Sequence, residues 1–360
     1  MLFLKNFTLR FLWLFTFVPS VFADQYPFNY QIDIKHYTFS LTLSDDTNEI
    51  IGTTSIKILF KSNDVSRFRL DLASKTKERL GKGMNVSSVA SEDTQLKYRH
   101  QNDALIIKMD QPVREGEIRT FIIQYRGIPE AGLEIKNNRF GDRTFFCESW
   151  PNNTRHWLPT IDHPYEKATV EFKIIAPEKY KVVSNGLLIE ESLLDRNRKF
   201  THWKQSVPVS CWLFMLGVAE FAVQNVGTFE GKSIQSWVYA KNRDAGFHDF
   251  AHITKDALEF FSHYVGPFAY EKLANIQSSS LTNGAMETAS AITYAENLIT
   301  GQVTERLRNV MIHEIAHQWF GNSVTEVTWD DAWLSEGFAT YFTMLFQEHQ
   351  YGHRAYIKEL

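Results

Sequence analysis

The chain has 360 residues, of which 44% are hydrophobic and 22% are charged, so it can bury a large core and its length suggests two domains. Its formal net charge is -4, which gives no reason to expect binding to nucleic acid or to anionic lipid. The two cysteines, Cys147 and Cys211, give no reason to expect a cysteine-based metal site. We expect them to be free thiols, and a disulfide between them is the alternative in an exported protein.

Residues 1–23 have the pattern of a secretory signal peptide. Lys5 and Arg10 form a positive region, residues 11–18 form an apolar core, and residues 21–23 form a cleavage site that ends in a small residue. The apolar stretch is too short to span a membrane comfortably, and an uncleaved N-terminal anchor is the alternative. We therefore expect an exported protein, periplasmic or secreted, without a further membrane segment.

The N-terminal half has hydrophobic residues that recur with a period of two, which is typical of β-strands. Turn residues separate these runs. The pattern predicts strands at residues 37–43, 54–60, 120–125, 168–175 and 180–183. We therefore expect residues 24–225 to form an all-β domain, most of which serves as a scaffold.

A second domain is predicted for residues 226–360, because the period of the pattern changes there. One more strand is expected at residues 236–240. Apolar residues then recur at helical spacing from Phe250 to Tyr264, before a Gly-Pro pair that ends the helix.

A second helix is expected to begin after Thr304, which can cap it, and to end at Gly321. It contains the sequence H-E-I-A-H, from His313 to His317. Histidines four residues apart lie on one face of a helix and can bind the same metal ion. Glu314, between them, is positioned to accept a proton from water. A histidine pair that only packs in the core is the competing interpretation.

The third ligand is predicted to be Glu336, which is separated from His317 by eighteen residues. It belongs to a third helix that starts near Asp330 or Asp331. We expect this helix to bury a broad apolar face formed by Trp333, Leu334, Phe338, Tyr341, Phe342, Leu345 and Phe346. Two histidines and one carboxylate leave a coordination position open, as in catalytic zinc sites. The sequence therefore predicts one Zn²⁺ ion per chain, held by His313, His317 and Glu336.

Two stretches, residues 313–325 and 331–341, resemble the core of a zinc aminopeptidase of the M1 (gluzincin) family. The segment 284–288, G-A-M-E-T, resembles the G-x-M-E-N motif of that family, with Thr288 where asparagine is usual. The resemblance runs from about residue 30 to the end of the chain. It implies an α+β multidomain fold, in which an all-β, saddle-like N-terminal domain precedes a thermolysin-like zinc-peptidase domain.

The resemblance also implies roles in binding a peptide substrate. The peptide would lie as an added strand along the edge segment formed by Gly284, Ala285 and Met286. Glu287 would bind its N-terminal ammonium group, assisted by Glu148 from a loop of the β domain. With Glu314 as the general base, these residues imply a zinc-dependent aminopeptidase that hydrolyses the N-terminal residue of peptides.

The sequence departs from the family beyond the third zinc ligand. The family stabilises the oxyanion with a tyrosine that lies farther on than the 24 residues that follow Glu336. We therefore expect an incomplete catalytic domain, and we expect neither Tyr341 nor Tyr294 to replace that tyrosine. The alternative function is a catalytically silent zinc- and peptide-binding protein or an inactive fragment. Lipid epoxide hydrolysis, found in one M1 branch, is a third and weaker alternative.

Overall fold

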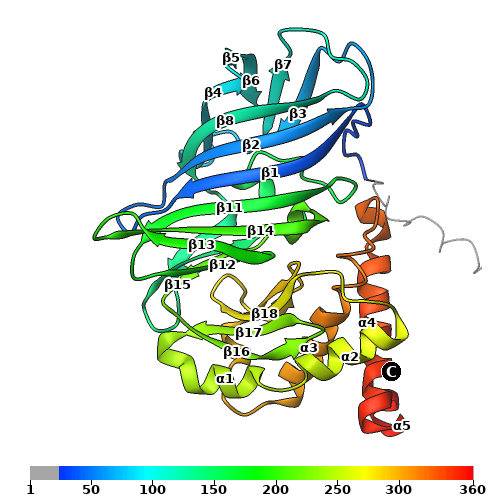
Figure 1. Cartoon of the computed structure of the whole chain (residues 1–360). Coiled ribbons are helices and arrows are strands. Elements are labelled where there is room, and N and C mark those ends of the chain that lie inside the picture. The colour runs from blue at the N-terminus through cyan, green and yellow to red at the C-terminus, as the bar shows by residue number, and fades with distance from the viewer. Residues whose placement is uncertain (1–23, 360) are drawn as a thin grey trace, which may run out of the picture.

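An eight-stranded sheet dominates the N-terminal part of the computed structural model, which describes residues 24–359 and thus leaves out the predicted signal peptide (Figure 1). Its order is β13-β14-β11-β1-β2-β8-β4-β5, with β1 parallel to β11 and the other neighbours antiparallel. The strands are β1 (Ile32–Thr42), β2 (Ile50–Phe60), β4 (Gly83–Ser91), β5 (Thr94–Gln95), β8 (Ile118–Ile128), β11 (Lys167–Pro177), β13 (Leu187–Leu193) and β14 (Arg198–Ser210).

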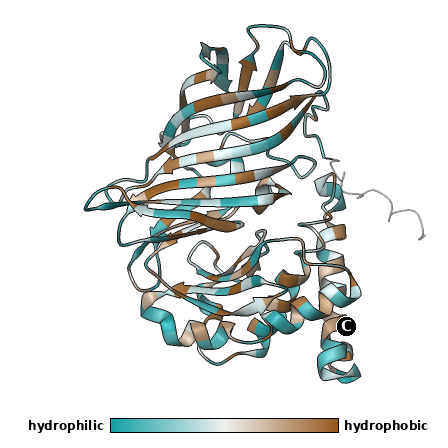
Figure 2. Ribbon diagram, in the orientation of Figure 1, coloured by the Kyte–Doolittle hydropathy of each residue, from teal (hydrophilic) through white to brown (hydrophobic). Residues whose placement is uncertain are grey.

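The period of two in the sequence has a direct structural cause in this sheet. Successive side chains of a strand point to opposite faces, and only one face of the sheet lies on the core. Buried and more exposed residues therefore alternate along β1 and β11, and hydropathy alternates along the strands in Figure 2. The predicted strands at residues 37–43, 54–60, 120–125 and 168–175 are confirmed.

Two smaller sheets cover the inner face of the large sheet. One has the order β12-β15-β10-β9, and the other has the order β3-β7-β6. Their bounds are β3 (Arg67–Asp71), β6 (Lys97–Gln101), β7 (Ala104–Lys108), β9 (Gly132–Asn137), β10 (Arg143–Glu148), β12 (Lys181–Ser184) and β15 (Leu216–Ala219), with short 3₁₀ helices η1 (Thr154–His156) and η2 (Cys211–Leu213). Aromatic rings join the layers: the ring centroids of Phe39 and Phe214 lie 5.9 Å apart, and those of Phe68 and Phe121 lie 4.8 Å apart.

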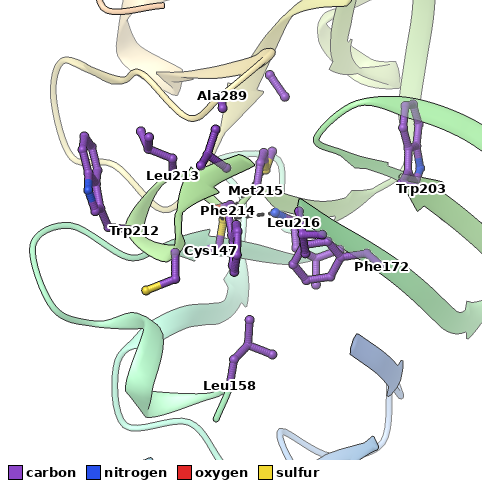
Figure 3. Close-up of a cluster of buried hydrophobic side chains, with 14 of the residues drawn as sticks. Cys147, Leu158, Phe172, Trp203, Trp212, Leu213, Phe214, Met215, Leu216 and Ala289 are labelled. Carbon is purple, nitrogen blue, oxygen red and sulfur yellow. Dashed lines mark hydrogen bonds between the residues drawn. The ribbon is translucent and has the colours of Figure 1, made fainter. Parts of the chain in front are cut away.

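Both cysteines lie in this core as free thiols, as predicted. Cys147 packs among buried hydrophobic side chains (Figure 3), and its Sγ atom accepts a hydrogen bond from Leu216 N at 3.1 Å. Cys211 donates from Sγ to Ile161 O at 3.3 Å. Burial raises the pKa of the Cys147 thiol to about 12, so this thiol stays protonated and unreactive.

The C-terminal part is a five-stranded sheet with helices, which makes the whole an α+β fold as predicted. The sheet order is β16-β17-β18-β20-β19. The strands are β16 (Phe221–Phe229), β17 (Lys232–Tyr239), β18 (Lys272–Ser278), β19 (Ala285–Met286) and β20 (Ala291–Ala295). The helices are α1 (Arg243–Phe250), α2 (Thr254–Tyr264), α3 (Glu305–Ala316), α4 (Trp333–Tyr351) and α5 (His353–Glu359), with 3₁₀ helices η3 (Ala240–Asn242), η4 (Glu296–Leu298) and η5 (Trp329–Asp331). The predicted domain boundary after residue 225 falls inside β16.

Helix α3 begins as the sequence predicts, because Thr304 accepts a hydrogen bond from Leu307 N at its Oγ1 atom, at 3.2 Å. It ends at Ala316, before the predicted Gly321, and tighter turns continue from there. The helix predicted to run from Phe250 to Tyr264 starts only at Thr254. Ile253 has a φ angle of 70°, and this non-helical conformation separates α1 from α2.

The predicted burial of α4 is wrong for four of its apolar residues. Trp333 is 60% exposed and Tyr341 is 50% exposed, and Leu334 and Phe338 are exposed as well. Only one side of α4 packs against α2 and α3, where the ring centroids of Phe346 and Phe260 lie 5.3 Å apart. The pattern is apolar nearly all round this helix, so it does not indicate which side has a neighbour. None of the helices in residues 24–359 is long and apolar enough to cross a membrane.

Candidate metal centre

His313, His317 and Glu336 meet where α3 ends and α4 begins. The Nε2 atoms of the two histidines lie 3.0 Å apart. Glu336, in the first turn of α4, places its Oε2 atom 3.5 Å from His313 Nε2 and 3.6 Å from His317 Nε2. The sequence therefore predicted a group of side chains that the fold does bring together.

These separations fit a zinc ion. Zinc binds imidazole nitrogen and carboxylate oxygen at about 2.0–2.2 Å, so the ligand atoms of one tetrahedral ion lie roughly 3.3 Å from each other. The three distances of 3.0, 3.5 and 3.6 Å lie close to this value. The donor set of two imidazoles and one carboxylate is also that of catalytic zinc sites.

The orientation of His317 is fixed by groups that the sequence did not reveal. Its Nδ1 atom donates to Phe320 O at 3.0 Å and lies 3.1 Å from Ser335 Oγ. A proton held on Nδ1 leaves the lone pair of Nε2 directed toward His313 and Glu336. Ser335 precedes Glu336 in the chain, and nothing in its sequence context distinguishes it from any other helical serine.

Charge is concentrated around His317. Burial acts to lower the pKa of its imidazole, but Glu287, Glu336 and Glu314 more than offset burial and raise the pKa to about 10. Hydrogen bonds from the two histidines hold the pKa of Glu336 far below its usual range. The three carboxylates, of which Glu287 and Glu314 are buried, thus favour a positive charge at this point, which a divalent cation supplies.

Glu314 is buried beside these ligands. Burial and the neighbouring Glu287 raise the pKa of its carboxyl group well above the usual value. Its Oε2 atom has no hydrogen-bond partner among residues 24–359. Glu287, Glu314 and His317 each offer a ligand-type atom within 4.8 Å of the others, so a second carboxylate lies next to the candidate base.

Glu287 follows β19, the edge strand of the five-stranded sheet, as the sequence predicted. Its carbonyl oxygen accepts hydrogen bonds from Gln318 Nε2 at 3.1 Å and Asn322 Nδ2 at 2.6 Å. Both donors belong to the stretch after His317, but sequence reasoning gave them no role. Thr288 donates from Oγ1 to Ala291 O within its own loop, and the two amides hold the backbone of Glu287.

The segment before Glu287 contains a turn at Gly284 and the short edge strand β19. Gly284 has a φ angle of 77°, which favours glycine. Ala285 and Met286 pair with Tyr294 and Thr293 of β20, and β19 ends the sheet. Its other edge therefore has backbone groups that no strand of the described chain pairs.

Glu148 is the last residue of β10, and the prediction that it lies in a loop is wrong. The ladder with β9 extends to this residue, where Glu148 is opposite Gly132. Burial, then Glu287 and Glu134, raise the pKa of its carboxyl group to about 7. The β domain thus contributes a half-buried carboxylate that interacts electrostatically with Glu287.

Glu326 is a buried carboxylate that the sequence analysis missed. Burial raises the pKa of its carboxyl group to about 7, and Glu287 and Glu336 act in the same direction. The ammonium group of Lys167 on β11 interacts with it and donates to Ser323 O at 2.9 Å. Glu326 follows the H-E-x-x-H segment by nine residues, in a loop without periodicity, so no pattern marks it.

Neither of the two tyrosines considered as oxyanion donors directs its hydroxyl group at the metal ligands. Tyr294 is fully buried and donates from its hydroxyl to Asn275 Oδ1 at 3.1 Å. Tyr341 lies on the exposed side of α4.

Known proteins resemble the chain over both parts. Residues 33–213 match the model of the peptidase M1 N-terminal domain, and residues 250–360 match that of the peptidase family M1 domain. Glutamyl aminopeptidase of Rattus norvegicus is 33% identical over 207 residues, which are 55% of this chain and 22% of that protein. Aminopeptidase N of Homo sapiens is 33% identical over 205 residues, 54% of this chain and 21% of that protein. The aligned part is thus about a fifth of each of these relatives.

Solved structures show the same fold. The M1 zinc metallopeptidase from Deinococcus radiodurans superimposes with a TM-score of 0.75 and 24% identity, over 91% of this chain and 72% of that one. The native LTA4 hydrolase of yeast gives a TM-score of 0.79 and 18% identity, over 91% of this chain and 50% of that one. With one family model matching half of the sequence and a second matching the part that holds the metal centre, the chain belongs to the M1 family of peptidases.

Proposed function

We propose that this chain is an aminopeptidase that removes the N-terminal residue from peptides. The observation that carries the proposal is the buried carboxylate of Glu287, which is neither a predicted metal ligand nor the predicted base. Its atoms lie within 4.8 Å of those of Glu314 and His317. A carboxylate in a partly desolvated pocket beside a metal centre suits a substrate ammonium group at a fixed distance from the scissile bond.

Membership of the M1 family implies one zinc ion, and His313, His317 and Glu336 would hold it. When bound, zinc polarises the scissile carbonyl and lowers the pKa of a coordinated water. The hydrogen bond from His317 Nδ1 to Phe320 O keeps the ring in the tautomer that a metal requires.

Substrate binding in this proposal uses the free edge of β19. Ala285 and Met286 offer backbone groups to an extended peptide, which would add to the sheet as one more strand. Glu287, at the end of this edge, and Glu148 from the β domain receive the ammonium group. The peptide then has one direction and one register, so a single residue is released in each turnover.

Glu314 acts as the general base and acid. Its Oε2 atom, which has no hydrogen-bond partner among the described residues, accepts the proton of the attacking water. The same oxygen delivers this proton to the departing amine.

The test is the hydrolysis of aminoacyl anilides by the chain purified from a secretory host, with and without a zinc chelator. We expect release of the aniline and the free amino acid, which the chelator abolishes, and no release of the aniline from the same anilides after N-acetylation. Cleavage of acetylated substrates at an equal rate would contradict the assignment of Glu287.

A second candidate is a catalytically silent zinc- and peptide-binding protein. It is favoured by Tyr294, which is bonded to Asn275, and by Tyr341, which lies on the exposed side of α4, because an oxyanion donor must face the reacting carbonyl. A folded, zinc-loaded chain without turnover would support this candidate.

We also propose that residues 1–23 direct export and are then removed. The reason is their sequence pattern, a positive region followed by an apolar core and a small residue. N-terminal sequencing of the exported protein should begin at Asp24. A protein that keeps residue 1 would support the alternative of an N-terminal membrane anchor.

A further inference from the structure

Lys272, the first residue of β18, is a fully buried lysine outside the metal centre. Its Nζ atom donates to Ser184 O at 2.9 Å and to Ser290 O at 3.1 Å. It also lies 5.2 Å from the ring centroid of Trp203. Burial lowers the pKa of this amine to about 7, and a cation so buried needs hydrogen bonds to be tolerated. Both of its bonds go to backbone carbonyls, one on each side of the boundary between the two parts of the chain.

Ser290 is the point at which several hydrogen bonds converge. Its φ angle is 63°, a conformation that a serine adopts only when its surroundings fix it. Every polar group of the residue has a partner. These are Gln318 Oε1 for its N–H (2.9 Å), Lys272 Nζ and Ala274 N for its carbonyl (3.1 and 3.0 Å), and Gln205 Oε1 and Gly186 N for its hydroxyl (3.0 and 2.8 Å).

The turn between β12 and β13 in the β domain binds the same loop. Asn185 donates from Nδ2 to Ala289 O at 2.6 Å and to Leu213 O at 3.0 Å. Ala289 in turn donates from its N–H to Leu213 O at 3.1 Å, and the two residues lie near each other in Figure 3. The loop is therefore fixed from the β domain by Ser184, Asn185 and Gly186 together.

The loop connects this network to the site. Ser290 lies three residues after Glu287, and Gln318 comes directly after His317. The Gln318 side chain accepts from Ser290 N and donates to Glu287 O at 3.1 Å. A displacement of Ser290 would thus change the position of Glu287 relative to His317.

We propose that Lys272 is a positioning residue, whose bridge from Ser184 to Ser290 holds Glu287 at the correct distance from His317 for recognition of a substrate ammonium group. This inference rests on the proposed role of Glu287. It concerns amine recognition and assigns Lys272 no contact with the substrate.

The test compares two ligands that differ only in the amino group. A leucine hydroxamate and its deamino analogue both carry a zinc-binding hydroxamate, and only the first carries the ammonium. The dissociation constants are measured by calorimetry on the zinc-loaded chain. The dissociation constant of the deamino analogue divided by that of leucine hydroxamate reports amine recognition alone. We expect Lys272→Met to lower this ratio about tenfold, a change of about 1.4 kcal/mol, and to leave the affinity for the deamino analogue unchanged.

A matched control is available on the neighbouring strand. Lys232 donates from Nζ to Phe268 O, and it lies 5.2 Å from the ring centroid of Phe268. Lys232→Met thus removes a lysine–carbonyl bond and an aromatic contact of the same kind. Its ratio should equal that of the wild type. A purely structural role of Lys272 would weaken both ligands equally, and this result would overturn the proposal.

Three further variants test whether Lys272 acts through Glu287. If Lys272 acts through Glu287, then Glu287→Gln alone and together with Lys272→Met should give the same ratio. Additive losses would overturn the proposal. Where Lys272→Met does not fold, Ser290→Gly tests the loop to which Lys272 binds. It keeps the carbonyl that accepts from Lys272, removes the hydroxyl bonds and tolerates the positive φ, and it should lower the ratio in the same direction. An unchanged ratio would overturn the proposal, because the position of Ser290 would then not affect Glu287. A wild type without preference for the amino compound would instead contradict the role proposed for Glu287.

Discussion

Ser335 Oγ lies 3.1 Å from His317 Nδ1, and this contact joins the end of α3 to the first turn of α4 beside the metal ligands. Gly321 packs directly against this contact between Ser335 and His317. A Cβ atom added to Gly321 would lie 2.3 Å from Ser335 Oγ and 3.4 Å from His317 Nδ1. The two helices can therefore hold their ligands together only because this position has no side chain.

Replacement of Gly321 by alanine should weaken zinc binding. The φ angle of 103° strains any L-residue by about 1–3 kcal/mol, and the added methyl group displaces Ser335 and with it the His317 ring. We expect zinc affinity to fall about 10–100-fold, the usual effect of disturbing a partner of a metal ligand. Gly352→Ala is the control, because Gly352 has a φ of 84° but no atoms within 4 Å of the added Cβ. It should lower the unfolding temperature without changing the zinc titration.

Loss of the third ligand should remove the metal. Glu336→Gln leaves a neutral amide where the carboxylate lies 3.5 and 3.6 Å from the two Nε2 atoms, so zinc content after dialysis should drop far below one ion per chain. The side chain of Glu348, on the same helix, forms a hydrogen bond with the exposed His353, at 2.6 Å. Glu348→Gln should keep its zinc, and equal zinc loss in both variants would contradict the ligand assignment.

Replacement of the base should separate metal binding from chemistry. Glu314→Gln keeps the shape of the side chain but cannot accept a proton, so we expect full zinc occupancy and a kcat that is lower by at least about 10²–10⁴-fold. Anilide hydrolysis and metal analysis of the same sample provide the measurement. Turnover within a few-fold of wild type would show that another group takes the proton.

Titration of Glu166 should make the β domain less stable as the pH rises from about 4.5 to 8. It is buried, accepts a hydrogen bond from Ile34 N at 3.0 Å, and has its carboxyl pKa raised by burial from 4.5 to about 8. The folded state thus holds this proton more tightly than the unfolded state. Between about pH 4.5 and 8 the unfolded chain is ionised first, so stability is lost as pH rises through this window.

Glu166→Gln removes this titration and keeps an oxygen that accepts from Ile34 N. The difference in unfolding temperature between variant and wild type should therefore grow in favour of the variant from pH 5 to pH 8. Parallel pH profiles would mean that Glu166 does not titrate in this range. Glu49, partly buried and paired with Arg126 at 3.2 Å, provides the control substitution.

The sequence predicted the features that depend on short-range periodicity. The spacing of His313 and His317 and the cap at Thr304 are local, and β1 alternates with the period of two from Tyr37 to Thr42. The predicted ligands meet because the chain keeps a helical conformation through His317, the C-cap of α3, and because Glu336 lies in the first turn of α4. Periodicity could not predict which side of α4 is covered, and this is why Trp333 and Tyr341 were expected to be buried.

The remaining features of the site depend on tertiary contacts that no local pattern contains. Gln318 binds Glu287 across 31 positions, and Lys272 binds Ser184 across 88. Glu326 is buried by packing of a loop whose sequence resembles that of an exposed turn. The carboxylate of Glu148 was expected in the site from the family resemblance. Its position at the end of β10 follows from the pairing of β10 with β9, which no pattern around Glu148 predicts.

The hydrogen bonds between the turn at Ser184–Gly186 and the loop at Ala289 and Ser290 have a consequence for unfolding. Hydrogen bonds from Asn185 and Gly186, together with the Lys272 bridge, break if either part of the chain unfolds. Neither half can then melt without exposing unpaired polar groups of the other. We therefore expect heat to unfold both sheets in one cooperative transition, with equal calorimetric and van't Hoff enthalpies, so that the boundary in topology is not a boundary in stability.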